Sequence, residues 1–486
     1  MDMRGKTNSL ALGIEILTPV QCGSGQDLIR DMDYVAKDKQ VFVVDQVRSF
    51  NEIANAVNLD EDKWEEIKKS EKLQVLVDLA GYYGYTLKPF NRIGGVRDER
   101  VPDKIRAHLK DAYLQPYIAG SSIKGAIRTA LIAEHLRALP DDASIWNVLP
   151  TSRQKPKEKF ADDKLLEALL GKDPKQDIFR ALHSKDAIFS QDRLCLVDIR
   201  WLNLVRSGAQ DRAQWRSMAQ KKSYPEWQKA DGIHAEMLRP KSTAEFHLQW
   251  DEFLLSDVTQ WHTATQFTLP ANFNDLKTTL NQHARYRLNQ EIAFYHHYGV
   301  LKPAQECQKL LQQLAANPNS IYLQLSWGSG WRGMTGDWLD EETSLTMRHL
   351  YNLGKETMPF PKTRRLAVVG EPKLPLGWVR LYTHDATDQP TAATSSNQAV
   401  ANIPLSVLEQ ELQALKGKPE RDWDGPLLQK LEQARSWDST DKKQVAEKIQ
   451  QLMTTAGKWC PEYVGTDKDK LKYKTRSLKV LAFITQ

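Results

Sequence analysis

The chain has 486 residues, 41% of them hydrophobic and 27% charged, and its 67 lysines and arginines exceed its 62 acidic residues by only five. A chain of this length forms roughly two to four domains, and the apolar fraction is enough to bury a sizeable core. The net charge is too mild to demand a nucleic-acid partner, although it does not oppose one.

Cysteine usage and hydropathy exclude two further classes. The cysteines are far apart and form no CxxC pair, so neither a zinc site nor a disulfide framework is expected; they are Cys22, Cys195, Cys307 and Cys460. No apolar run approaches the length of a membrane span, and the start MDMRGKTNSL does not resemble a signal peptide. We therefore expect a soluble, cytoplasmic protein without membrane contacts, metal or cofactor.

The N-terminal part predicts strands followed by a helix. Residues 10–20, LALGIEILTPV, alternate around Ile14 and Ile16 and lead into the glycine turn QCGSGQ. Residues 32–46, MDYVAKDKQVFVVDQ, predict a hairpin around KDKQ, and Asp45 is typical of the N-cap of a following helix.

A second helix is predicted to begin within PYIAGSSIKGAIRTAL, residues 116–131, because apolar residues recur at helical spacing from Ile123 onward. The first turn of a helix carries unpaired N–H groups and a positive dipole end, which suit a phosphate. The glycine and serines would form the turn and cap, with basic residues beside them. An ordinary serine-capped amphipathic helix is the alternative. The candidate phosphate-binding residues are Gly120, Ser121, Ser122, Lys124, Gly125 and Arg128.

The remaining chain alternates between strand-rich and helix-rich segments, which predicts two α+β halves. Leu194, Leu196 and Ile199 are expected core residues of a β-rich stretch, and a strand pair is expected around Pro240. In chain order the segments are the β-rich stretch 177–205, the strand pair 234–251, helices at 272–298 and 303–316, and a closing strand at 377–385. Residues 387–400 predict a polar linker, followed by helices at 404–417, 426–437 and 441–459.

The stretch LSWGSGWRGMTG, residues 325–336, contains a literal GxGxxG motif after a predicted strand. A dinucleotide site would need a helix opening at once, whereas the next helical pattern begins near Ser344. A tight turn that requires positive φ is one alternative. A backbone that lies close to a sugar–phosphate chain, with an indole to stack and a guanidinium to grip phosphate, is the other. The candidate residues are Gly328, Ser329, Gly330, Trp331, Arg332 and Gly333.

Two basic clusters support a polyanionic partner. Residues 361–380 carry five basic residues against one acid, and residues 468–479 carry six against one. A solvated charged face is the alternative reading of each cluster.

These segments together resemble the RAMP superfamily of type III CRISPR complexes over about residues 8–385. IEILTPVQCGSGQDL is similar to the first strand and turn of that family, PYIAGSSIKGAIRTAL to its helix-capping signature, and HSKDAIF to a segment in which Asp186 ends a strand. HAEMLRPKSTAEFHLQW, the glycine-rich loop and LPLGWVRL follow in the family's order. The chain departs from the pattern at Ala119, where the family usually has proline, and beyond residue 387.

The order of segments is most similar to that of the fifth subunits of Csm (type III-A) complexes, which lie at the head of the complex near the crRNA 3′ end. The resemblance implies an α+β fold of two tandem ferredoxin-like (RRM-related) RAMP domains with a C-terminal helical extension. The expected divisions are residues 1–235 with helical insertions, 236–386 with the glycine-rich loop, and 387–486 as linker and helical tail. The implied partners are crRNA, other Csm-like subunits and, as a further candidate, target RNA.

The expected function is therefore a non-catalytic RNA-binding subunit that holds the crRNA 3′ region and supports assembly of the complex and crRNA maturation in antiviral defence. The alternative is a RAMP endoribonuclease, because some members of the superfamily cut RNA. No histidine stands in a motif with a second catalytic partner, and Asp162 and Asp163 lie in a charged connector, so no catalytic residue is assigned. His183 and Asp186 are the least implausible catalytic pair.

Overall fold

The computed structural model describes most of residues 7–383 and 423–484. Outside the described residues lie 1–6, 31, 38–39, 46, 49–50, 52–83, 91–101, 141–142, 150–162, 172, 174, 176, 209, 260–266, 271, 340, 354–357, 384–422, 434–438 and 485–486. The chain divides into two compact units, Met1–Pro390 and Thr391–Gln486. The predicted linker 387–400 and the predicted helix at 404–417 fall outside the described residues.

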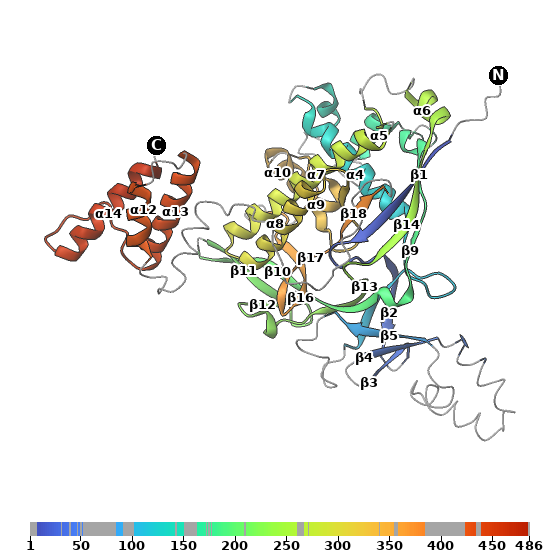
Figure 1. Ribbon diagram of the computed structural model, residues 1–486, viewed down its shortest axis with the longest axis horizontal. Helices are drawn as coiled ribbons and strands as arrows, with labels where there is room; N and C mark the ends of the chain where they lie inside the picture. The colour runs from blue at the N-terminus through green and yellow to red at the C-terminus, as the bar shows by residue number, and fades with distance from the viewer. Residues whose placement is uncertain are drawn as a thin grey trace. The chain divides into compact units, whose positions relative to one another are not determined.

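A five-stranded antiparallel sheet lies at the centre of the first unit (Figure 1). Strand β1 (Thr7–Ile16) pairs on one side with β14, where Ile14 lies opposite Ala244. On the other side it pairs with β18, where Ile14 lies opposite Leu381. Leu12, Ile14 and Ile16 are fully buried, as the alternation predicted. In spatial order the strands are β15 (Ile321–Gln324), β18 (Trp378–Tyr382), β1 (Thr7–Ile16), β14 (Thr243–Asp251) and β8 (Leu182–Ser184).

Helices cover this sheet because their apolar faces match its buried side chains in one core. Helix α4 (Gly120–Ala138) packs on α7 (Phe273–His297), which in turn packs on α8 (Leu301–Ala316) (Figure 1). The predicted helices at 272–298 and 303–316 are confirmed, and Asn272 caps α7 by accepting a hydrogen bond from the Asp275 amide at 3.0 Å. Strands β1, β8, β14 and β18, with α4 and α7 between them, thus occur in the order β–α–β–β–α–β.

The second sheet has eleven strands and, like the first, takes strands from both sides of residue 235. Its path runs through β2 (Gly23–Ile29), β6 (Lys104–His108), β13 (Ile233–Leu238), β10 (Leu194–Ser207), β5 (Gly84–Pro89), β4 (Gln40–Val44) and β3 (Tyr34–Lys37). Strands β11 (Gln210–Ser217), β12 (Lys222–Tyr224), β16 (Thr363–Val369) and β17 (Glu371–Pro375) branch from β10. The predicted division at residues 235 and 236 stays a prediction.

Smaller elements complete the first unit. The short strands β7 (Tyr117–Ile118) and β9 (Ala187–Ile188) pair with each other. Among the described residues of this unit the remaining helices are α5 (Asp163–Leu170), α6 (Glu252–Thr259), α9 (Gly330–Thr335) and α10 (Glu341–Leu350). Short 3₁₀ helices occur at Ser144–Val148, Ile178–Ala181, Gln191–Arg193 and Trp227–Lys229.

Two predictions need correction, and several are confirmed. The strands around Pro240 do not pair with each other, because β13 belongs to the eleven-stranded sheet and β14 to the five-stranded sheet. A helix does open at the glycine-rich loop, since α9 begins at Gly330 rather than near Ser344. The hairpin of β3 and β4 is confirmed, as is the burial of Leu194, Leu196 and Ile199. The amide of Arg48 donates to Asp45 Oδ1 at 3.0 Å, as an N-cap requires.

The second unit contains α12 (Asp424–Gln433), α13 (Ser439–Thr455) and α14 (Lys468–Ile484), which share one apolar core. The first two helices were predicted, whereas α14 appeared in the sequence only as a basic cluster. Its Arg476 contacts the buried Asp424 at 3.0 Å, and Lys458 contacts the same carboxylate at 2.8 Å. None of the described helices has the length and apolar character needed to cross a membrane.

A backbone junction joins three distant segments, 17–22, 325–328 and 376–378. The amides of Leu17 and Thr18 donate to the Trp378 carbonyl at 2.9 and 3.1 Å, and the Gly377 amide donates to the Pro19 carbonyl at 2.9 Å. Leu325 in turn donates to the Gly377 carbonyl at 2.7 Å. This junction fixes where the glycine-rich loop leaves β15.

Replacement of Gly377 by alanine is expected to destabilise the first unit by at least about 2 kcal/mol. Gly377 has φ +87°, and an added Cβ would lie 2.3 Å from the Leu325 carbonyl oxygen. The matched control is Gly370→Ala, where φ is +77° but nothing lies within 4 Å, so only the backbone strain of about 1–2 kcal/mol applies. Urea unfolding of the full chain, followed by tryptophan fluorescence, measures both; equal losses would contradict the role of the junction.

Candidate nucleic-acid interface

The N-terminus of α4 begins where the sequence predicted, but its capping differs. Ala119 is the N-cap, no side chain caps the helix there, and the Gly120 amide donates to Asp186 Oδ1 at 2.7 Å. The expectation of a serine cap is therefore wrong, because the carboxylate reaches the helix start from the loop after β8. Gly120 is required here, since a Cβ would lie 2.1 Å from the Ser184 carbonyl oxygen.

The basic residues of this helix start have an acidic neighbour. Arg128 Nη2 lies 3.6 Å from Asp177 Oδ2 and its guanidinium lies over the Phe179 ring. Burial lowers the pKa of Lys124, while the nearby Asp177 opposes that shift and Arg128 adds to it. Ser121 and Gly125 are exposed, and Lys124 is half-buried. The helix start thus offers a cationic edge that Asp177 and Asp186 partly neutralise.

The start of α4, the glycine-rich loop and the predicted turn QCGSGQ meet at Cys22. Its buried thiol lies 3.0 Å from Ser326 Oγ and within hydrogen-bonding reach of the Ser122 side chain. Burial raises the pKa of this thiol, and the two hydroxyls only partly offset the shift. Further along α4, Arg137 Nη1 donates to the Gly336 carbonyl at 3.0 Å. The glycine-rich loop is therefore packed along α4 over its length.

The glycines of the loop are required for different structural reasons. Gly328 and Gly330 have φ +101° and +75°, which confirms the requirement for positive φ. Gly333 lies in α9, where a Cβ would meet Ser329 Cβ at 2.6 Å. Ser329 itself donates to the Ser326 carbonyl at 2.9 Å and closes the turn. The loop therefore forms a tight turn, and this turn is also compatible with a backbone that lies close to a ligand.

Trp331 and Arg332 line a cavity rather than the outer surface. The cavity has a volume of about 480 Å³ and lies between α7, the glycine-rich loop and residues 358–365. The Trp331 ring packs edge-on against Phe360 at 4.9 Å. Arg332 Nη1 lies 3.0 Å from Asp337 Oδ2 and 3.3 Å from Gln290 Oε1. The predicted stacking and phosphate-gripping pair thus faces inward and is partly held by protein groups.

A stack of alternating arginines and tryptophans lies beside the loop and was not predicted. Arg106 on β6 and Arg365 on β16 lie over the Trp327 ring at 4.6 and 4.8 Å, and Arg365 also lies over Trp201 at 5.1 Å. Trp201 on β10 is the direct cross-strand neighbour of Arg365. We call these four residues the arginine–tryptophan ladder. Arg365 lies in the basic cluster at 361–380 and Trp327 in the stretch LSWGSGWRGMTG, whereas Arg106 and Trp201 had no sequence signal. Strand pairing brings Trp201 to Arg365, and Trp327 joins them from the turn after β15.

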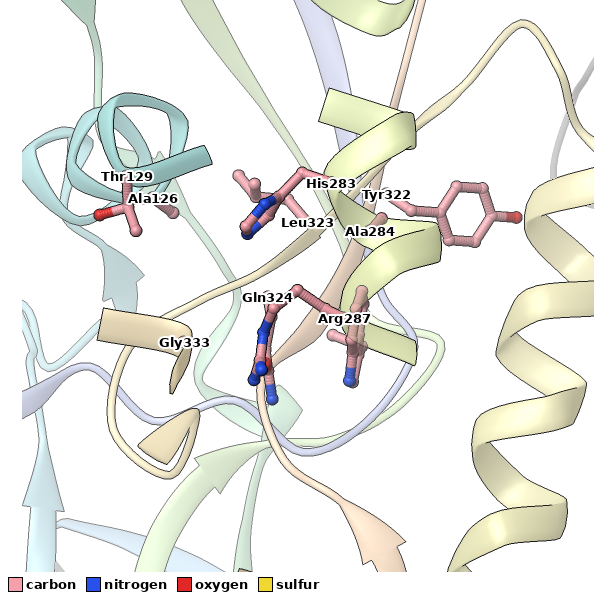
Figure 2. A pocket seen from close by; sticks show the side chains of 10 residues that line it. Ala126, Thr129, His283, Ala284, Arg287, Tyr322, Leu323, Gln324 and Gly333 are labelled. Atoms are coloured by element: carbon pink, nitrogen blue, oxygen red, sulfur yellow. The ribbon is translucent and has the colours of Figure 1, made fainter. Parts of the chain in front are cut away.

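Arg287 is a further candidate site residue that was not predicted from the sequence, because it lies within the predicted helix at 272–298. It is 3% exposed, and its Nη1 atom lies 4.0 Å from Asp337 Oδ2. Burial lowers the pKa of Arg287, and the nearby Glu291 and Asp337 carboxylates oppose that shift. Figure 2 shows Arg287 beside Gln324 and His283 at a second cavity of only about 10 Å³, room for at most one water.

The candidate catalytic pair lies on β8 and in the loop that follows it. Asp186 is held by the Gly120 amide, and His183 is exposed on β8, where it pairs with Gln249 of β14. Within the described part of the chain no group of three or more histidine, cysteine, aspartate or glutamate side chains is placed to hold a metal ion.

Comparisons with known proteins identify the family of this chain. The model of the RAMP superfamily matches residues 13–331. A chain of a cryo-EM structure of a Csm–crRNA–target RNA ternary complex from a type III-A CRISPR–Cas system is similar with a TM-score of 0.53 and 21% identity, over 76% of this chain and 99% of that chain. The crystal structure of Csm5 from T. onnurineus gives a TM-score of 0.49 and 19% identity over the same shares. No curated protein matches.

Replacement of Asp186 by alanine is expected to lower the free energy of unfolding by about 1 kcal/mol, the usual cost of losing a helix N-cap. Asp186→Asn keeps an oxygen that accepts from the Gly120 amide and is expected to lose clearly less. Paired urea-unfolding curves measure the difference. Two variants that unfold alike would show that Asp186 does not cap α4.

Proposed function

Because this chain belongs to the RAMP superfamily, we propose that it is a non-catalytic RNA-binding subunit of a Csm-like type III CRISPR effector. In that role it holds the 3′ region of the crRNA and supports assembly of the complex and crRNA maturation. The partners proposed are crRNA, sister subunits and target RNA. The similar chain of the ternary complex, which contains crRNA and target RNA, supports this choice of partners.

The arginine–tryptophan ladder carries the proposal. Single-stranded RNA is bound by cationic side chains that contact phosphates and by flat rings on which bases stack. The ladder supplies both at a single site, since the guanidinium groups of Arg106 and Arg365 lie 4.6 and 4.8 Å from the centre of the Trp327 ring. Trp327 directly precedes Gly328, so a strand on the ladder would pass the glycine-rich loop, whose residues 328–333 and the start of α4 are proposed as further RNA contacts.

The topology supports tandem ferredoxin-like domains in a strand-exchanged form. A β–α–β–β–α–β unit with the spatial order 4-1-3-2 matches β18, β1, β14 and β8. Its last strand then comes from the C-terminal half of the chain. We propose that the eleven-stranded sheet contains the second such domain, and that residues 391–486 form an accessory helical unit.

Trp327→Ala is expected to weaken binding of single-stranded RNA by about 1–3 kcal/mol, the usual contribution of one stacked base. Trp327→Phe keeps a ring and should retain most of the affinity. Fluorescence polarisation with a labelled crRNA-length oligonucleotide measures both variants. Equal binding by the alanine variant and the parent would remove the ladder from the interface.

Arg365→Ala is expected to reduce the slope of log K against log salt concentration by about 0.7, the value for one lost phosphate contact on a single strand. Lys124→Ala and Arg332→Ala should also reduce retention of crRNA without unfolding the chain. Arg285 is an exposed arginine on α7 and provides the control Arg285→Ala. Unchanged slopes in all three test variants would contradict phosphate binding at these positions.

A RAMP nuclease is the competing function, and His183 with Asp186 is the pair it would use. Since Asp186 caps α4, we expect the purified chain to leave a labelled RNA intact, with or without Mg²⁺ or Mn²⁺. Denaturing gels over several hours give the readout. Cleavage that His183→Ala abolishes would overturn the non-catalytic assignment.

A further inference from the structure

The cavity behind the glycine-rich loop has the size of a ligand pocket. Its volume of about 480 Å³ falls within the range of roughly 300–1,000 Å³ that small-molecule sites occupy. Its walls come mainly from α7, the loop itself and residues 358–365. The cavity is also lined by Cys307 of α8, Arg348 of α10, and Pro375, Leu376 and Trp378.

The charge of the lining favours an anion. Among the described residues, six cationic side chains line the cavity against one carboxylate, Glu291; they are Arg287, Arg332, Arg348, Lys362, Arg364 and Arg365. Glu291 is already paired, because Arg364 Nε lies 2.6 Å from its Oε2. Burial alone would raise the pKa of Glu291, but Arg364 and Arg287 outweigh it and hold that pKa below its usual range. Arg332 also contacts the carboxylate of Asp337 at 3.0 Å, but the lining itself keeps an excess of positive charge.

Arg287 is the most informative group in the cavity. Its Nε and Nη1 atoms are buried and have no hydrogen-bond partner among the described residues, and Asp337 at 4.0 Å is too distant for a hydrogen bond. Arg332 Nε is buried without a partner in the same way. Burying guanidinium donors that have no acceptor is costly, so the unpartnered donors of Arg287 and Arg332 beside one cavity indicate a ligand that accepts hydrogen bonds.

Another part of the cavity lining is aromatic and apolar. Trp331 and Phe360 form an edge-on pair, and Met358 lies beside them with 9% of its surface exposed. A flat, partly polar ring can stack on such a wall. A ligand with one anionic group and one planar heterocycle would match both parts of the lining.

We propose that this cavity holds one nucleotide of the bound RNA, with its phosphate at Arg287 and Arg332 and its base against Trp331 and Phe360. The inference rests on the proposed function, since the ladder must deliver the strand. Arg365 belongs to the ladder and also lines the cavity. A strand stacked on Trp327 therefore passes the opening, and a single nucleotide can turn inward.

Binding of full-length variants to single-stranded RNA tests the role of Arg287. Arg287→Met removes the buried guanidinium and keeps a long side chain, and is expected to weaken RNA binding at least about tenfold, as the loss of one charge-assisted hydrogen bond predicts. The matched control is Arg285→Met, which removes an exposed charge two residues away on the same helix and should change the affinity less than about twofold. Thermal melting is expected to show that Arg287→Met is no less stable than the parent, since an unpartnered charge is removed.

Photo-crosslinking of the unmodified chain gives an independent readout that does not depend on any variant folding. RNA carrying 5-iodouridine either at its 3′ end or at an interior position is irradiated with the protein, and the linked peptide is identified by mass spectrometry. A crosslink to Trp331 or Phe360 supports the proposal, and the position that reacts shows whether a terminal or an interior nucleotide enters.

Two different results would overturn the inference, and each rules out a different part of it. If the chain binds RNA but every crosslink maps to Trp327 or Trp201 and Arg287→Met binds like Arg285→Met, the strand follows the ladder without entering the cavity. If the parent chain binds no RNA, the proposed function fails together with the cavity.

Discussion

The pairing of β1 with β18 is the constraint on which the rest of the first unit depends. It joins Gly13–Ile16 to Val379–Tyr382 by regular antiparallel register. The junction next to it anchors the exit of β15, so the glycine-rich loop can only leave toward α4. Backbone hydrogen bonds between segments more than 300 residues apart therefore position both motifs, and side chains such as Cys22 add local contacts.

The buried charged side chains of the first unit are of two kinds. Some are paired with an opposite charge, and others keep hydrogen-bond donors that have no acceptor. Arg364 with Glu291, and Arg137 with Glu134 and His283, are paired inside the helical layer. Breaking such a pair is costly, because one charge would stay buried alone. Arg287 instead keeps donors without acceptors at the cavity. The unpartnered donors of Arg287 therefore identify the candidate ligand site more specifically than the total positive charge of the cavity does.

Local patterns in the sequence were enough to predict most helices and strands. The alternation around Ile14, the helix at 272–298 and the start of α4 all depend on neighbouring residues, and all were confirmed. Partners that are distant in sequence were not predictable. Asp186 replaces the expected serine cap, β13 and β14 separate into two sheets, and the ladder forms only when β6, β10 and β16 lie together. The RNA-binding roles of the two motifs stay a prediction.

The late position of β18 in the chain has a consequence for biosynthesis. A ribosome adds about 5–20 residues per second, so β14 emerges well before its sheet can be completed at β18. During that interval β1 has one unpaired edge, which is a template for unwanted strand addition. The junction, and with it the anchored glycine-rich loop, is absent until the last strand arrives. A nascent or truncated polypeptide that ends before β18 therefore lacks the junction and the anchored loop.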